Sequence, residues 1–231
     1  MVQFTVYRQN IWYGWWWWNY RSDKVMIARG VINTDENGEF EIKFKAIPDL
    51  EMPKGQNTAF NYSISVDVTD INGETQSTSS GVTVGYTALK ISTNLSDKIS
   101  KNNLNSDNQH FVIYSKNLNY QDVQSGGKIE VYSLKMPENS VKNRYWKKPD
   151  EHIYTKDEWK KNTKSHEYDQ EANFKFWETD KIVWTAQYDT KETDKIQNKD
   201  FAKFQDGVYK MLITSEDIFG NPVTHEHFFV I

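Results

Sequence analysis

Two histidines near the C-terminus are the residues best spaced to bind a metal. His225 and His227 are two apart, so in a β-strand both imidazoles would lie on one face, where zinc could reach them. A zinc site needs further ligands, and the sequence offers no third ligand at a suitable spacing and no cysteine. We therefore favour a hydrogen-bonded strand surface at these histidines and predict neither a metal nor a cofactor.

Three Asp-to-Gly segments could present carboxylates to calcium: Asp35–Gly38, Asp70–Gly73 and Asp217–Gly220. None continues into the twelve-residue calcium loop with its terminal Glu. An aspartate that bonds its own backbone, followed by a glycine that accepts positive φ, is typical of a turn. We therefore predict three turns.

Catalytic residues are not indicated by the sequence. Carboxylate pairs such as Asp67 and Asp70 are unavoidable among 32 acidic residues. The sequence has no Gly-x-Ser-x-Gly elbow, no phosphate-binding glycine loop and no His-Glu-x-x-His. We predict a protein that is not an enzyme.

A tryptophan block is the most conspicuous candidate for binding. If Trp15, Trp16, Trp17 and Trp18 form a strand, alternation places two rings on each face. Each ring carries about 150–250 Å² of largely apolar surface, so exposure of both faces is costly. The block could stack on sugars or enter a membrane interface, but we favour a long hairpin that packs on a neighbouring domain. Tyr145 and Trp146 complete this candidate interaction surface.

Composition restricts the class of protein. Hydrophobic residues make up 37% of the 231-residue chain and aromatic residues 15%, which favours packed cores built from strands. A net charge of −4 without a basic stripe argues against a nucleic-acid partner. No apolar run reaches the roughly 20 residues of a transmembrane helix, and the first residues lack the features of a signal peptide.

An internal repeat indicates two domains of one type. Tyr62 and Tyr209 each precede an aspartate by eight residues and a glycine by eleven, with alternating apolar residues between. This pattern predicts the same hairpin twice, and hence a domain over residues 1–86 and another over 87–231. Tyr209 also resembles the tyrosine that hydrogen-bonds back to the backbone at a corner of many Greek-key sandwiches.

The elements follow from alternation and turn residues. In the second domain we expect strands before the hairpin at Leu89–Asn94, His110–Lys116, Lys128–Lys135, Lys181–Asp189 and Phe201–Phe204. In the first domain we expect strands before the hairpin at Phe4–Tyr7, which matches Ile129–Tyr132, at Lys24–Val31 and, after a turn at Thr34–Gly38, at Glu39–Ala46. The first domain thus lacks counterparts of the first two strands, so we expect the chain to begin inside a domain.

A polar insertion with scattered aromatic residues separates two strands of the second domain, over about residues 136–180. Thr155 and Glu158 form a capping box, which predicts a short helix at Lys156–Asn162. We expect Trp159 to hold this helix against the sandwich. The fold class predicted overall is all-β, with two immunoglobulin-like sandwiches in tandem.

Several strings resemble one protein family when they are taken together. They are Val6-Tyr-Arg8, the Trp15–Trp18 block, Gly30-x-x-x-Thr34-Asp-x-x-Gly-x-Phe40, Val68-Thr-Asp-x-Asn-Gly-Glu-Thr-Gln76, Val84-Gly-Tyr86 and Arg144-Tyr-Trp-x-x-Pro-Asp150. In combination they resemble the macroglobulin-domain region of the alpha-2-macroglobulin-like proteins of Bacteroidetes, around the fourth and fifth macroglobulin domains.

The resemblance implies a function that the residues alone do not. Such proteins are long chains of macroglobulin-type sandwiches, exported to the periplasm or cell envelope and often anchored as lipoproteins. Some are endopeptidase inhibitors that trap proteases through a bait segment and a thioester. The thioester requires a cysteine, which this sequence lacks. The expected role is therefore a non-catalytic structural segment, whose partners are neighbouring macroglobulin domains, with proteases as targets of the parent protein. The alternative is a surface module that binds carbohydrate or protein through the tryptophan-rich loop.

Overall fold

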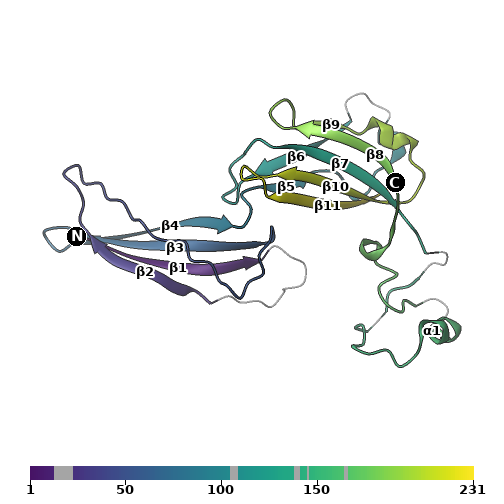
Figure 1. The fold of residues 1–231 in the computed structure, drawn as a ribbon, viewed down its shortest axis with the longest axis horizontal. Helices are drawn as coiled ribbons and strands as arrows, with labels where there is room; N and C mark the ends of the chain where they lie inside the picture. The colour runs from purple at the N-terminus through teal and green to yellow at the C-terminus, as the bar shows by residue number, and fades with distance from the viewer. Residues whose placement is uncertain (13–22, 105–108, 138–140, 145, 164–165) are drawn as a thin grey trace. The chain divides into compact units, whose positions relative to one another are not determined.

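The computed structural model describes residues 1–12, 23–104, 109–137, 141–144, 146–163 and 166–231 (Figure 1). The chain is all-β, with three antiparallel sheets. It divides into two compact units. Unit 1 comprises residues 1–90, 115–123 and 216–223, and unit 2 comprises residues 91–114, 124–215 and 224–231.

A single four-stranded sheet forms most of unit 1. Its strands are β1 (Val2–Trp12), β2 (Val25–Ile32), β3 (Thr58–Thr69) and β4 (Thr75–Gly85), in the order β2-β1-β3-β4. Alternating apolar residues give the sheet one buried face, because successive side chains of a strand point to opposite sides. Val6 of β1 lies opposite Ile64 of β3, and Val6, Phe60 and Tyr62 form the centre of the core.

Two sheets lie against each other in unit 2. One has the order β11-β10-β7-β8 and the other β5-β6-β9 (Figure 1). The strands are β5 (Lys90–Thr93), β6 (His110–Lys116), β7 (Gly126–Leu134), β8 (Thr179–Asp189), β9 (Lys195–Gln197), β10 (Val208–Glu216) and β11 (Pro222–Val230). Phe111 of β6 and Phe229 of β11 both stack on Phe201, so the aromatic core joins the two sheets.

Both copies of the predicted hairpin are present, as β3–β4 and as β10–β11. β1 and β7 occupy the same place beside these hairpins, as the match between Phe4–Tyr7 and Ile129–Tyr132 predicted. The Tyr209 hydroxyl donates to the Gln205 carbonyl at 2.7 Å, which confirms the predicted corner. The Tyr62 hydroxyl instead donates to the more distant Ile47 carbonyl at 3.0 Å.

The predicted turns share one geometry. In each, the aspartate Oδ1 accepts backbone N–H groups from the residues two and four positions later, and the glycine has positive φ. Asn117 builds the same turn, accepting from Asn119 and Gln121, but Tyr120 stands at the glycine position with φ 64°. The Asp-to-Gly pattern could not predict this fourth turn, because residues 117–121 contain neither Asp nor Gly.

Two predicted strands are wrong. Phe201–Phe204 overlaps a 3-10 helix, η3 (Lys199–Lys203), because apolar residues three apart share a face of a three-residue turn. Glu39–Ala46 follows the predicted turn but has no strand ladder in the described part of the chain. Ile42 and Phe44 are nevertheless half-buried, while Glu41, Lys43 and Lys45 are exposed. The predicted alternation is therefore present, but no strand of the described residues pairs with this segment.

Candidate binding surface in the insertion

The insertion joins β7 to β8 and contains the only α-helix of the described residues, α1 (Lys156–Asn162). The predicted capping box is confirmed at both contacts. Glu158 N donates to Thr155 Oγ1 at 3.4 Å, and Thr155 N donates to Glu158 Oε2 at 2.9 Å. The Thr155 N–H and the Thr155 hydroxyl both donate to the Glu158 carboxylate, and they lower its pKa because they favour its charged form.

Arg144 holds the insertion together. Its Nη1 donates to the Tyr168 carbonyl at 2.8 Å, and its Nη2 donates to the Asp169 carbonyl at 2.5 Å. Its Nε lies 3.6 Å from Glu167 Oε1. The side chain is only 5% exposed, so these partners satisfy a charge that would otherwise be buried alone. Arg144 therefore fixes the path of residues 167–169 beside its own segment of the insertion.

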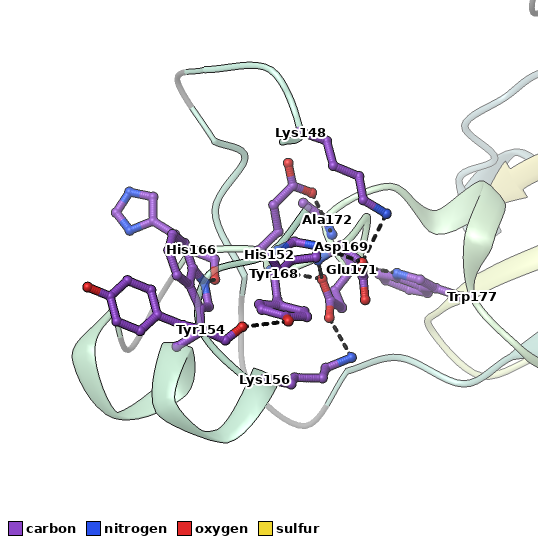
Figure 2. Close-up of polar contacts among 12 residues, drawn as sticks. Lys148, His152, Tyr154, Lys156, His166, Tyr168, Asp169, Glu171, Ala172 and Trp177 are labelled. Carbon is purple, nitrogen blue, oxygen red and sulfur yellow. Dashed lines mark hydrogen bonds and ion pairs between the residues drawn. The ribbon is translucent and has the colours of Figure 1, made fainter. Parts of the chain in front are cut away.

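Two carboxylates organise the charged groups on this part of the insertion (Figure 2). Asp169 lies 3.0 Å from Lys148 Nζ and 3.3 Å from His152 Nε2. Glu171 lies 2.6 Å from Lys156 Nζ and also accepts the backbone N–H groups of Tyr168 and Asp169.

The pKa shifts of this cluster follow from its hydrogen bonds. The Lys148 hydrogen bond, which outweighs burial, lowers the pKa of Asp169. Burial favours the neutral form of Glu171, but the hydrogen bonds from Lys156 and the backbone outweigh it and lower the pKa. The hydrogen bond to Glu171 raises the pKa of Lys156. Both carboxylates are therefore charged at neutral pH and pair with the neighbouring cations.

Aromatic rings form the other wall of the site. The His152 and Tyr168 rings stack at 3.9 Å, and the Tyr168 hydroxyl donates to the Tyr154 carbonyl at 2.7 Å. Trp159 meets Trp146 edge-on at 6.5 Å, and its Nε1 donates to the His166 carbonyl at 3.0 Å. The expectation that Trp159 holds α1 against the sandwich is wrong, because every contact described for it lies within the insertion.

Trp146 lies between two hollows of different character. One, of about 150 Å³, is mainly apolar and includes Ile153, Trp159 and Tyr168 in its wall. The other, of about 460 Å³, is mainly polar and includes Lys148 and Glu167. Trp146 itself remains 53% exposed. An exposed indole beside charged hydrogen-bonding groups can stack on one face of a ligand while the ligand's polar groups bond to the neighbours.

Of the candidate surface predicted from the sequence, only Trp146 can be placed. Trp15, Trp16, Trp17, Trp18 and Tyr145 lie outside the described residues. The structure adds Arg144, Tyr168 and Asp169, none of which had been assigned a role. The partners of Arg144 are more than twenty residues away along the chain, so spacing alone could not reveal them.

The two C-terminal histidines lie on β11, and both are only partly buried. Burial lowers the pKa of His225, helped by the nearby His227. Burial also lowers the pKa of His227, although Asp97 at 3.6 Å opposes the shift. Among the described residues, no group of three or more His, Cys, Asp or Glu side chains could hold a metal ion.

No family model, curated protein or solved structure matches this chain. Within the described ranges, no helix combines the length and the apolar character that crossing a membrane requires.

Proposed function

We propose that this chain is a non-catalytic scaffold segment of a large alpha-2-macroglobulin-like protein of the bacterial cell envelope. The observation that carries the proposal is that one sheet plan occurs twice, as β2-β1-β3-β4 and as β8-β7-β10-β11. In both copies the same aspartate-capped turn joins a central strand to the edge strand beside it, β3 to β4 and β10 to β11. Tandem copies of one sheet plan are the organisation expected of a macroglobulin-type scaffold.

In unit 2 the sheet partition also fits an immunoglobulin-like sandwich. Seven strands divide into four and three, and a tyrosine corner lies at the start of the penultimate strand. The macroglobulin-type identity rests on the sequence strings described above. Under this proposal the parent protein traps proteases in the periplasm or cell envelope, and this segment transmits or resists the rearrangement of its domains.

Protease trapping by the full-length protein tests the proposal. A protease held in a trap should keep cleaving a small chromogenic peptide while it loses activity on a large protein substrate. Deleting residues 1–231 from the full-length protein should abolish that difference, whereas the segment alone should neither inhibit nor cleave. Unchanged trapping after the deletion would contradict the scaffold role.

A second candidate is carbohydrate binding by the insertion, which is favoured by the exposure of Trp146 beside a polar hollow. Sugars present an apolar face for stacking and hydroxyl groups for hydrogen bonding. The test is intrinsic tryptophan fluorescence during titration with cell-wall and storage polysaccharides, with Trp146→Ala as the matched variant. A saturable shift that disappears in Trp146→Ala would support this candidate, and no shift with any polysaccharide would exclude it.

A further inference from the structure

Residues Glu39–Ala46 have the side-chain pattern of a strand without its hydrogen bonds. Among the described residues, no backbone-to-backbone hydrogen bond involves residues 40–46. The segment nevertheless lies against the core of unit 1, since the Phe44 and Tyr62 rings are 5.8 Å apart. A row of unpaired N–H and C=O groups on an extended segment is the feature to which another strand adds.

The end of this segment is firmly positioned. The Ile47 carbonyl accepts hydrogen bonds from Tyr62 Oη at 3.0 Å and from Arg8 Nη1 at 3.2 Å. Asp49 forms an ion pair with Arg8 at 3.1 Å, and the Asn10 side chain donates to Asp49 at 2.7 Å. Residues 40–46 are therefore held over the sheet between this anchor and the Asp35 turn, so little ordering is needed before a strand can pair with them.

Unit 2 shows which strand pairs with the element that corresponds to residues 39–46. There β9 is the element that precedes the tyrosine hairpin, as residues 39–46 precede it in unit 1. β9 pairs antiparallel with β6, with Phe111 opposite Ile196, and β5 continues the same sheet. The β6 side chains Phe111, Ile113 and Ser115 are buried, and they alternate with Val112 and Tyr114. A strand of this pattern thus covers the four-stranded sheet of unit 2.

We propose that Glu39–Ala46 is an acceptor edge for an added antiparallel β-strand, supplied by a polypeptide segment with the alternation of β6. The inward side chains of this occupant are apolar and complete the layer begun by Ile42 and Phe44. Its outward side chains lie beside the row of Glu41, Lys43 and Lys45. Glu41 is paired with Lys43 at 2.9 Å, which leaves Lys45 as the net positive charge of the row, so the occupant carries an acidic residue there.

Exposed apolar residues around the edge support this occupant. Phe40 of the segment is 39% exposed, and Ile47 and Leu50, which follow the segment, are 46% and 84% exposed. Apolar side chains beside an unpaired backbone are a surface that an added strand would cover. The acceptor edge does not require the scaffold role proposed above, since it follows from the unpaired backbone alone.

Hydrogen exchange of the backbone amides tests the acceptor edge. In the chain by itself, the amides of residues 40–46 should exchange within about tenfold of unstructured rates. A copy of residues 89–125, which contains β5, β6 and the link to β7, is then fused directly before Val2, because β1 holds the place of β7. In the fusion, exchange at alternate amides of residues 40–46 should slow by at least about tenfold.

Two controls and one independent arm make the result decisive. The fused copy carrying Phe111→Asp and Ile113→Asp should give no protection, and Lys43→Pro in the acceptor should also abolish it, since proline removes a donor and obstructs pairing. Unchanged exchange at Ile196 would show that unit 2 keeps its own β6. The independent arm adds a free peptide of residues 109–117 at millimolar concentration. The proposal is overturned if residues 40–46 are already protected in the chain by itself, or if neither the fused nor the free strand protects them.

Discussion

The four-stranded sheets of the two units share a strand order, but what lies against each of them differs. In unit 2 a second sheet, β5-β6-β9, closes the core. In unit 1 the corresponding face is covered by the connection between β2 and β3, which contributes Phe44 and Met52. The strand order of each four-stranded sheet is therefore determined by the hairpin and its neighbouring strands. The layer that covers the sheet forms its own hydrogen-bonded ladder only where a partner strand is present.

The difference also appears in the cores. The fully buried aliphatic residues of β7 and β10 are Ile129, Val131, Met211 and Ile213, each 0% exposed. In unit 1 only Val2 and Val6 reach this level among the described aliphatic residues, and Ile64 is half-buried. A residue with packing on both sides loses more on truncation than one with packing on one side, because fewer atoms can move into the cavity.

Truncating a core isoleucine in each unit gives the largest expected effect. Ile213→Ala should lower the free energy of unfolding of unit 2 by about 3 kcal/mol, because it leaves a cavity between two sheets. Ile64→Ala in unit 1 should cost about 1 kcal/mol, because its site is half-buried. Urea unfolding monitored by residue-resolved hydrogen exchange measures both. Equal losses would show that the covering connection packs as well as a second sheet.

The insertion provides the next contrast, because it is held by polar contacts rather than by a sheet. Arg144→Met should lower the free energy of local opening of residues 141–177 by about 2–3 kcal/mol, because it leaves Glu167 and two backbone carbonyls without their partner. Arg144→Lys is the matched control, and it should recover only part of the loss because one ammonium cannot serve both carbonyls. Near-ultraviolet circular dichroism and exchange of the insertion amides measure the effect. A uniform destabilisation of the β7 and β10 amides would contradict a local role.

The two hairpin turns differ in how deeply their aspartates are placed. Asp217 is 7% exposed and also accepts the Ala88 N–H at 2.8 Å. Burial favours its neutral form, but the hydrogen bonds from Ala88, Asn221 and Phe219 prevail and lower its pKa from 3.8 to about 2. A carboxyl whose pKa is depressed on folding adds stability above its unfolded pKa, and that stability is lost as pH falls from about 4 to about 2.

Ionised Asp217 should accordingly contribute about 2 kcal/mol to the free energy of unfolding at neutral pH, and protonation in acid removes this contribution. Unfolding of the wild type and of Asp217→Asn is compared between pH 7 and pH 2. The two proteins should differ at pH 7 and converge toward pH 2. Asp70→Asn is the control, and its smaller effect is expected because Asp70 lies exposed in the equivalent turn. A constant difference in unfolding free energy between the two proteins across this pH range would show that Asp217 acts through its shape and not through its charge.

Repetition and alternation made most of the sheet plan predictable. β6 and α1 agree with their predicted bounds, and both tyrosine hairpins are present. Glu39–Ala46 shows where such prediction ends, because alternation reports burial of one face and not the presence of a partner strand. The insertion was less predictable still. Its capping box is local, but the Arg144 contacts depend on how distant segments come together.

The fourth turn offers the smallest and most local comparison. Tyr120 occupies, at φ 64°, the position that glycine holds at φ 81°, 86° and 79° in the other three turns. A side chain in this region costs about 1–2 kcal/mol, while glycine adds about 0.5–1 kcal/mol of unfolded-state entropy. Tyr120→Gly should therefore raise the free energy of unfolding by up to about 1 kcal/mol.

Tyr120→Ala separates strain from the ring. The Tyr120 ring is 70% exposed and lies 5.9 Å from Lys90 Nζ, a contact that both substitutions remove. Alanine keeps the Cβ and hence the strain, so it should be neutral or slightly destabilising. The difference in stability between the two variants measures the strain minus the unfolded-state entropy that glycine adds. Thermal unfolding of the three proteins at one pH provides the comparison. If Tyr120→Gly is less stable than Tyr120→Ala by about the 0.5–1 kcal/mol of glycine entropy, the backbone at residue 120 is relaxed, and this turn differs in kind from the three glycine turns.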